Sequence, residues 1–219
     1  MNFTTSEENY IKSIYHLEGV DGMVTTNELA AELKTTPASV SDMLKKLKVK
    51  KLLIYEKYQG FKLSNEGKKI ALGIIRKHRL WEYFLVHKLE LGWDEVHEIA
   101  EQLEHINSPI LIEKLDTFLD YPKFDPHGDP IPDINGKMEV NKQINLIDLQ
   151  INTLAEVSAV GSQSTELLEL LRHKNISIGT RLEVKRKFNF DNSIEIKIKT
   201  IPAFSISQQL AQTLFVKII

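Results

Sequence analysis

A ten-residue stretch, VHEIAEQLEH at positions 96–105, constrains this chain of 219 residues more than any other. On a helix, with about 100° between successive residues, four of its polar side chains share one arc while the apolar ones share another. The four are His97, Glu101, Glu104 and His105. Neighbouring acids on such an arc repel each other unless a cation lies between them. The stretch therefore predicts an amphipathic helix that packs by one face and binds a metal ion by the other; a solvated polar face is the alternative.

His78 and Glu82, in RKHRLWEYFL, repeat this chemistry at helical i, i+4 spacing. Imidazole nitrogen beside carboxylate oxygen suits a divalent first-row metal. The chain has no cysteine, which excludes disulfides and thiolate metal sites. A pair of this kind is also common as ordinary surface pairing, and both interpretations stay open at this point.

Length and composition indicate a protein of two or three small domains. The N-terminus lacks the charged-then-apolar pattern of a signal peptide, and no apolar run approaches the roughly 18 residues of a membrane span. We therefore expect a cytoplasmic protein. The formal net charge is −2, but residues 34–62 carry eight lysines against two acids, a local net charge of +6. This segment is a candidate for contact with nucleic-acid phosphates.

The first 72 residues have the pattern of a winged helix-turn-helix. Thr5 and Glu8 have capping-box spacing before a first helix, and Thr25 with Glu28 repeats that spacing before a second. Thr36 and Pro37 then start a third helix. LLIYEKYQGFKLS follows and predicts a β-hairpin turning near residues 58–60.

In such a module the start of the third helix enters the major groove of double-stranded DNA. We expect its first residues at base edges, and nearby lysines, including one in the hairpin, at phosphates. The predicted DNA-binding residues are Thr36, Pro37, Ala38, Ser39, Ser41, Asp42, Lys45, Lys46 and Lys57.

Residues 73–140 predict a helical domain that ends in a linker. A helical pattern runs for over twenty residues from Ser64, and further helices are expected at 96–105 and after Ser108-Pro109. These helices carry more large apolar residues than one subunit would bury, which favours a homodimer. PKFDPHGDPIPDING, at 122–136, is rich in proline and glycine, so we interpret it as an interdomain loop. Its His127 is interpreted as structural, with a role as a ligand as the alternative.

Residues 141–219 change to the period of two that is typical of strands. INLIDLQINTLAEVSAVG, TRLEVKRKF, SIEIKIKTI and TLFVKII predict strands, and STELLELLRH and SQQLAQ predict short helices. The fold class is therefore mainly α with β: a winged helix-turn-helix, a helical dimerisation and metal-binding domain, and a small SH3-like barrel.

Several segments together resemble the diphtheria toxin repressor family of metal-dependent regulators, with ligand types closest to the manganese transport regulators. They are TSEENYIKSIYHLE, LLIYEKYQGFKLSNEGKKIA, RKHRLWEYFL, VHEIAEQLEH and PHGDPIP. The resemblance implies a dimeric repressor that Fe(II) or Mn(II) activates to bind operator DNA and switch off metal-uptake genes. Zn(II) is expected to bind as well.

The resemblance also implies two metal positions. One would use His78, Glu82 and His97, with Arg79 assisting an anion there; the other would use Asn9, Glu101, Glu104 and His105. Gln163 and Glu166 lie where three-domain members offer further ligands to the first position. Two residues depart from the pattern: Asn9 replaces a methionine or aspartate, and Lys12 replaces a glutamate ligand of the manganese regulators.

A metal that joins the first helix to the later helices would fix the spacing of two recognition helices, which must lie about 34 Å apart to read adjacent half-sites. Two other classes of function stay open. A metal-independent winged-helix regulator could sense an organic ligand, and its DNA binding would survive a chelator. A metallohydrolase could use the same ligands, but it would leave the winged module unexplained.

Overall fold

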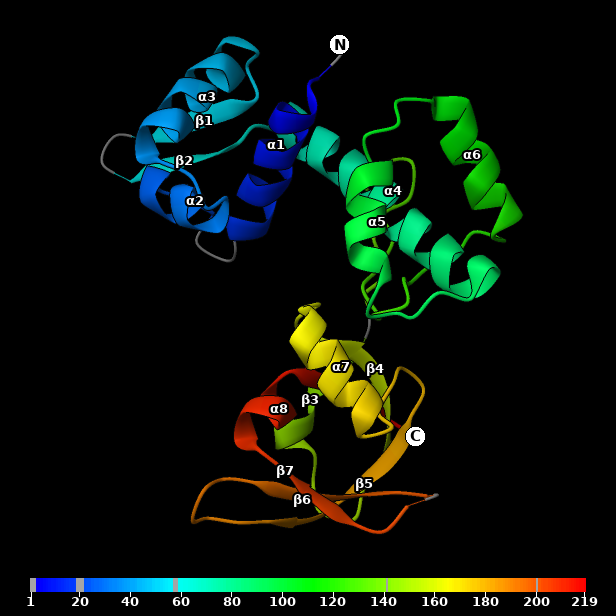
Figure 1. Ribbon diagram of the computed structural model, residues 1–219. Coiled ribbons are helices and arrows are strands. Elements are labelled where there is room, and N and C mark those ends of the chain that lie inside the picture. The colour runs from blue at the N-terminus through cyan, green and yellow to red at the C-terminus, as the bar shows by residue number, and fades with distance from the viewer. Residues whose placement is uncertain (1–2, 19–21, 57–58, 141, 200) are drawn as a thin grey trace. The chain divides into compact units, whose positions relative to one another are not determined.

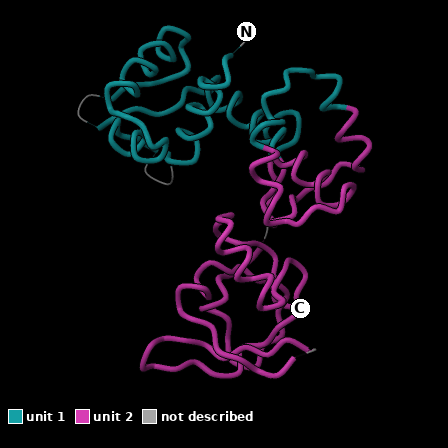
Figure 2. The backbone as a smooth tube through the Cα atoms, viewed as in Figure 1, with its two compact units in different colours: residues 1–78, 101–113, 132–137 teal, residues 79–100, 114–131, 138–219 magenta. Residues whose placement is uncertain are grey.

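The computed structural model describes residues 3–18, 22–56, 59–140, 142–199 and 201–219, and Figure 1 labels its helices and strands. The chain forms two compact units (Figure 2). The first comprises residues 1–78, 101–113 and 132–137, and the second comprises residues 79–100, 114–131 and 138–219. The division into domains at 1–72, 73–140 and 141–219 stays a prediction.

The first unit contains the predicted winged helix-turn-helix. Its elements are α1 (Thr5–Leu17), α2 (Thr26–Glu32), α3 (Pro37–Val49), β1 (Leu53–Glu56) and β2 (Gly60–Leu63). Thr25 and Glu28 form the expected capping box before α2, and the Thr36 side chain caps α3. Between these helices Lys34 has a φ of 48°, the left-handed backbone of a tight turn.

The cap of α1 lies one residue earlier than predicted. Thr4 is the N-cap, and its capping box is completed by Glu7 rather than by Glu8. The sequence TTSEE offers two overlapping pairs at the required spacing, so the pattern alone could not choose between them. As a result, Glu8 is not used for capping and bonds to another part of the chain.

Apolar side chains of the three helices and the hairpin form one core. Fully buried members include Ile11, Ile14, Leu29, Val40, Leu47 and Phe61. The backbone of Val24, just before α2, exchanges two hydrogen bonds with that of Phe61, at 2.8 and 3.0 Å. The hairpin is therefore attached to the helices by backbone bonds as well as by packing.

Three further helices follow: α4 (Asn65–Leu89), α5 (Val96–Leu103) and α6 (Pro109–Phe118). The prediction that α5 extends to His105 was wrong, because Glu104 and His105 lie in the turn after it. Pro109 begins α6, and the chain must leave helical geometry before a proline that starts a new helix. Among the described residues, no helix is long and apolar enough to cross a membrane.

The C-terminal part contains the predicted small β domain. Its sheet is antiparallel, with the order β3-β8-β4-β5-β6-β7. The elements are β3 (Ile144–Asn145), a 3₁₀ helix (Leu146–Asp148), β4 (Leu154–Val160), α7 (Thr165–His173), β5 (Arg181–Lys187), β6 (Ile194–Ile198), β7 (Phe204–Ile206), α8 (Gln208–Gln212) and β8 (Leu214–Ile218). The register shifts within β4·β8 and within β5·β6, and such bulges bend strands as a small barrel requires.

Two details of this domain were not predicted. The run from Ile144 to Gly161 is interrupted by the 3₁₀ helix and by Asn152, whose φ is 59°. The short strand β7 was also missed, because three residues are too few for a periodic pattern.

The loop at residues 124–130 is fixed against β4 within the second unit. The Val160 amide donates to the His127 carbonyl at 3.0 Å. Gly128 has a φ of +88°, and a Cβ atom placed there would lie 2.0 Å from the Ser158 carbonyl oxygen. Only glycine permits this close approach of loop and strand.

We predict that Gly128→Ala destabilises the second unit by more than the roughly 1–3 kcal/mol of backbone strain alone, because the new methyl group also meets β4. The matched control is Gly179→Ala: its φ is +84°, but a Cβ there meets no atom of the described residues within 4 Å. Urea unfolding followed by tryptophan fluorescence measures both, since Trp81 and Trp93 lie in this unit. Equal losses of stability in the two variants would contradict the close packing of loop and strand.

Candidate metal centre

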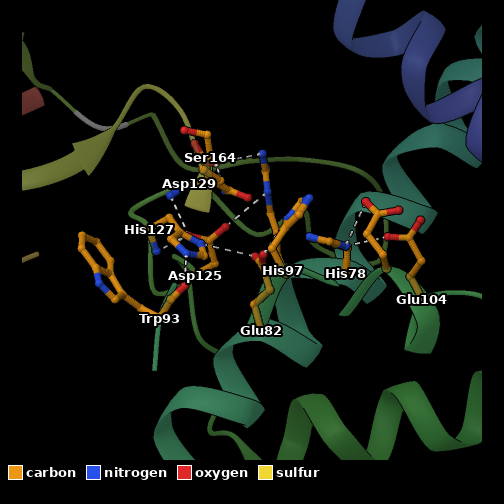
Figure 3. Close-up of polar contacts among 12 residues, drawn as sticks. His78, Glu82, Trp93, His97, Glu104, Asp125, His127, Asp129 and Ser164 are labelled. Atoms are coloured by element: carbon orange, nitrogen blue, oxygen red, sulfur yellow. Dashed lines mark hydrogen bonds and ion pairs between the residues drawn. The ribbon is translucent and has the colours of Figure 1, made fainter. Parts of the chain in front are cut away.

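Glu82, Asp125 and His127 form a buried cluster in the second unit. Glu82 lies on α4, and the other two lie in the loop at residues 124–130 (Figure 3). Each offers a ligand atom, and these atoms all lie within 4.8 Å of one another. Two carboxylates and one imidazole, removed from water, make a set of donors that can bind a divalent metal ion.

The orientation of His127 suits a ligand. Its Nε2 lies 2.8 Å from the Trp93 carbonyl oxygen and so acts as the donor. The Trp93 ring stacks on the imidazole, with 5.8 Å between the two ring centroids. Its Nδ1 lies 3.6 Å from Glu82 Oε2 and has no hydrogen-bond partner among the described residues. A carbonyl that holds one ring nitrogen leaves the lone pair of the other available to a metal. Burial alone would lower the pKa of His127, but Glu82 and Asp125 raise it above its ordinary value.

Asp125 organises the loop with one oxygen and offers the other to the centre. Its Oδ1 accepts from the amides of His127 and Asp129, at 2.8 and 3.0 Å. Its Oδ2 is buried without a hydrogen-bond partner among the described residues, 3.6 Å from Arg79 Nε. Burial, together with the negative charges of Glu82 and Asp129, raises the pKa of Asp125 to about 7. A dication beside Asp125 would favour its ionised form.

Arg79 and Gln163 hold the outer side of this loop. Arg79 donates to the Pro130 carbonyl at 2.6 Å, and its guanidinium lies 3.7 Å from Asp129. The Gln163 amide donates to Asp129 Oδ2 at 2.9 Å. Glu166 is exposed on α7 and lines a surface groove with Glu169, Leu170, Arg172 and His173. The contacts of Arg79 and Gln163 therefore support the loop, and a ligand role for Gln163 or Glu166 stays a prediction.

His97, on α5, adds a second imidazole to Glu82. Its Nδ1 lies 3.3 Å from Glu82 Oε1, and its side chain is 40% exposed. The predicted set of His78, Glu82 and His97 is divided between the units, because His78 belongs to the first. Their action as one ligand set stays a prediction.

In the first unit, the His78 ring lies beside the carboxylates of Glu101 and Glu104. Its Nδ1 is 2.6 Å from Glu104 Oε2, and Figure 3 draws both side chains. Glu104 and Glu101 also bond to the ammonium of Lys12. Burial would raise the pKa of Glu104, but the His78 hydrogen bond and the Lys12 charge lower it below its usual value.

Asn9 and His105 complete the second predicted set. His105 Nδ1 lies 2.5 Å from Glu8 Oε2, and Asn9 Oδ1 is buried without a hydrogen-bond partner among the described residues. In the structure, Glu101 and Glu104 therefore both bind the Lys12 ammonium. Metal binding by Asn9, Glu101, Glu104 and His105 stays a prediction.

Sequence reasoning missed the part that Asp125 and His127 play in the buried cluster. Asp125 was not among the predicted residues, and His127 was interpreted as a structural residue of an interdomain loop, with a role as a ligand only as the alternative. The available signal was the local density of donors in DPHGD, where two acids and a histidine surround a glycine. Proline and glycine indicated a loop correctly, but they carry no information about its burial.

The predicted DNA-binding residues gather at the start and outer face of α3. Those described are Thr36, Pro37, Ala38, Ser39, Ser41, Asp42, Lys45 and Lys46; Lys57 lies outside the described residues. All are exposed except half-buried Ser41, whose hydroxyl donates to the Pro37 carbonyl at 2.9 Å. Lys45 lies 2.9 Å from Asp42, a surface pair that is easily exchanged for a phosphate. Their contacts with DNA stay predictions.

Three family descriptions match successive parts of the chain. Residues 2–61 match the iron dependent repressor N-terminal DNA binding domain, and residues 64–133 match the metal binding and dimerisation domain of the same repressors. Residues 144–218 match the FeoA domain. The buried cluster draws Glu82, Asp125 and His127 from the second of these segments.

Individual proteins similar to this chain belong to the same group of repressors. The chain is 30% identical to the diphtheria toxin repressor of Corynebacterium jeikeium over 82% of this chain and 76% of that protein. It is 33% identical to the transcriptional regulator MntR of Oceanobacillus iheyensis over 70% of this chain and 98% of that protein.

Solved structures show the same likeness over nearly the whole length. A manganese-dependent transcriptional repressor in complex with manganese superposes with a TM-score of 0.85 at 29% identity, covering 97% of this chain and all of that one. ScaR with bound Cd²⁺ superposes with a TM-score of 0.79 at 33% identity, over 97% and 99%. The chain belongs to the diphtheria toxin repressor family, whose members are iron- and manganese-dependent DNA-binding transcriptional repressors rather than enzymes.

Proposed function

We propose that this chain represses genes for metal uptake, and that it binds operator DNA as a homodimer in the cytoplasm when Mn(II) or Fe(II) occupies the centre formed by Glu82, Asp125 and His127. The observation that carries the proposal is the burial of these three donors together, within a chain that also has a winged helix-turn-helix. Burying carboxylates is costly, and a dication would add positive charge beside Glu82 and Asp125.

The donors favour the metals named for the relatives. Carboxylate oxygen and imidazole nitrogen, without sulfur, suit Mn(II) and Fe(II), whereas softer ions prefer thiolate. When bound, the metal supplies positive charge to Glu82 and Asp125. His97, whose ring lies near Glu82, could contribute a further nitrogen.

The chain's own residues fix the donors before the metal arrives. The Trp93 carbonyl sets the tautomer of His127, the backbone amides of the loop hold one oxygen of Asp125, and Gly128 lets the loop lie against β4. Preorganised ligands lose less entropy on binding. A metal ion joining α4 to this loop would stabilise one arrangement of the helical region, and stronger binding to the DNA-competent state is what allosteric activation requires.

We predict that Asp125→Ala weakens Mn(II)-dependent operator binding by at least about 100-fold, since changes even to residues behind the ligands of a metal site cost 10–100-fold. The measurement is fluorescence anisotropy, at fixed Mn(II), with a DNA fragment selected from random sequence by the metal-loaded protein. Glu169→Ala is the control: it removes an exposed carboxylate from α7 that no predicted ligand set includes, and it should match the unaltered protein.

Two results would contradict this proposal. Operator binding that survives a chelator in the unaltered protein would favour a regulator that senses an organic ligand. Equal metal dependence in Asp125→Ala and Glu169→Ala would place the activating metal elsewhere.

A separate prediction concerns the DNA surface. Lys45→Ala and Lys46→Ala should each weaken binding to operator and random DNA alike, and should make the dependence on salt shallower by about one unit per lost phosphate contact. Lys197→Ala, an exposed lysine on β6, is the control and should leave the slope unchanged. If both α3 variants keep the original salt slope, α3 does not dock on the DNA backbone as proposed.

A further inference from the structure

Lys12 of α1 lies between two carboxylates from the α5 region of the first unit. Its ammonium bonds to Glu101 Oε1 and to both oxygens of Glu104, the latter at 2.7 and 2.9 Å. The Lys12 side chain is 12% exposed, and that of Glu104 is fully buried. A lysine of the DNA-binding module therefore neutralises acids that are about ninety residues away in the sequence.

A carboxylate buried to this degree needs a compensating charge or it takes up a proton. Glu104 has two sources of compensation, Lys12 and the His78 ring at 2.6 Å. Lys12 contacts both oxygens of this carboxylate, and the His78 ring contacts one of them. The acid is thus satisfied as a charged group by residues of the chain itself.

A second contact repeats the attachment one turn earlier on α1. Glu8 precedes Lys12 by four residues and so shares its face of the helix. Its carboxylate lies 2.5 Å from His105 Nδ1 and 3.8 Å from Lys77 Nζ. On α1 the acid Glu8 faces basic residues and the base Lys12 faces acids. These contacts are therefore attractive without an added ion.

A dication bound by Glu101 and Glu104 would compete directly with this arrangement. It would use the oxygen atoms that now accept from Lys12, and it would lie close to the ammonium, where like charges repel. Asn9, the remaining predicted ligand on α1, is neutral and adds no negative charge.

We propose that the Lys12 ammonium is a built-in cation that takes the place of a second metal ion at Glu101 and Glu104. The attachment of α1 to these residues then persists without metal, and regulation acts through Glu82, Asp125 and His127 alone. This inference rests on the proposed function, in which metal at that centre activates the protein.

Lys12→Met tests it, because methionine fills similar space without charge and leaves Glu101, Glu104 and His105 available to metal. Equilibrium dialysis with Mn(II), followed by elemental analysis, should find one more ion per subunit in Lys12→Met than in the unaltered protein. Lys12→Arg keeps the charge and should keep the original count. The same count in Lys12→Met and the unaltered protein would overturn the proposal.

Hydrogen exchange of the unaltered protein provides a test that needs no variant. Adding Mn(II) should slow amide exchange in α1 no more than in α2, which has the same core but lacks the lysine contact. Selective protection of α1 by the metal would overturn the proposal.

Asp125→Ala, made alone and together with Lys12→Met, separates this inference from the proposed function. It should remove one Mn(II) per subunit in both backgrounds. A count that Asp125→Ala leaves unchanged refutes the metal centre, whereas a normal loss from Asp125→Ala with no gain from Lys12→Met refutes only the role of Lys12.

Discussion

The burial of Glu82, Asp125 and His127 in one place is the constraint on which the second unit depends. Such groups are stable inside a protein only when neighbouring atoms or an ion satisfy them. The surrounding structure meets this need in detail: Trp93 holds the imidazole, loop amides hold Asp125, and Arg79 lies beside the acids. The docking of the loop on β4 keeps these partners in place.

Each unit contains a cluster of carboxylates whose negative charge must be compensated, and the two clusters differ in what compensates it. In the first unit an ammonium from α1 compensates Glu101 and Glu104. In the second unit Glu82 lies near both His127 and His97, and Arg79 lies 3.6 Å from Asp125. Asp125 Oδ2 and His127 Nδ1 have no hydrogen-bond partner among the described residues, so these two atoms are available to a metal ion. Helix α4 contributes one residue to each cluster. His78 contacts Glu104 in the first unit, and Glu82, four residues later on the same helix, lies near His127 in the second. Under the proposed function, metal acts at the cluster of Glu82, Asp125 and His127, while Lys12 holds α1 to Glu101 and Glu104.

Local sequence signals predicted the fold well and the site only in part. Capping residues, Pro37 and the alternating apolar pattern gave the winged module and most strands, since these depend on neighbouring residues. The ends of α5 and the choice between Thr4 and Thr5 depend on tertiary contacts. The cluster at Asp125 and His127 could not be assembled from periodicity, because it joins a loop to a helix over forty residues away. Lys12 was recognised as a departure from the family, but its bonding to both acids required coordinates.

The most direct measurement is anomalous diffraction from crystals of the unaltered protein grown with Mn(II). The account predicts an anomalous peak within about 2–2.6 Å of donor atoms of Glu82, Asp125 and His127, the usual range for oxygen and nitrogen ligands. It also predicts no peak between Glu101 and Glu104, where Lys12 should stay in place. A peak between those two acids, with none at Asp125 and His127, would contradict the account.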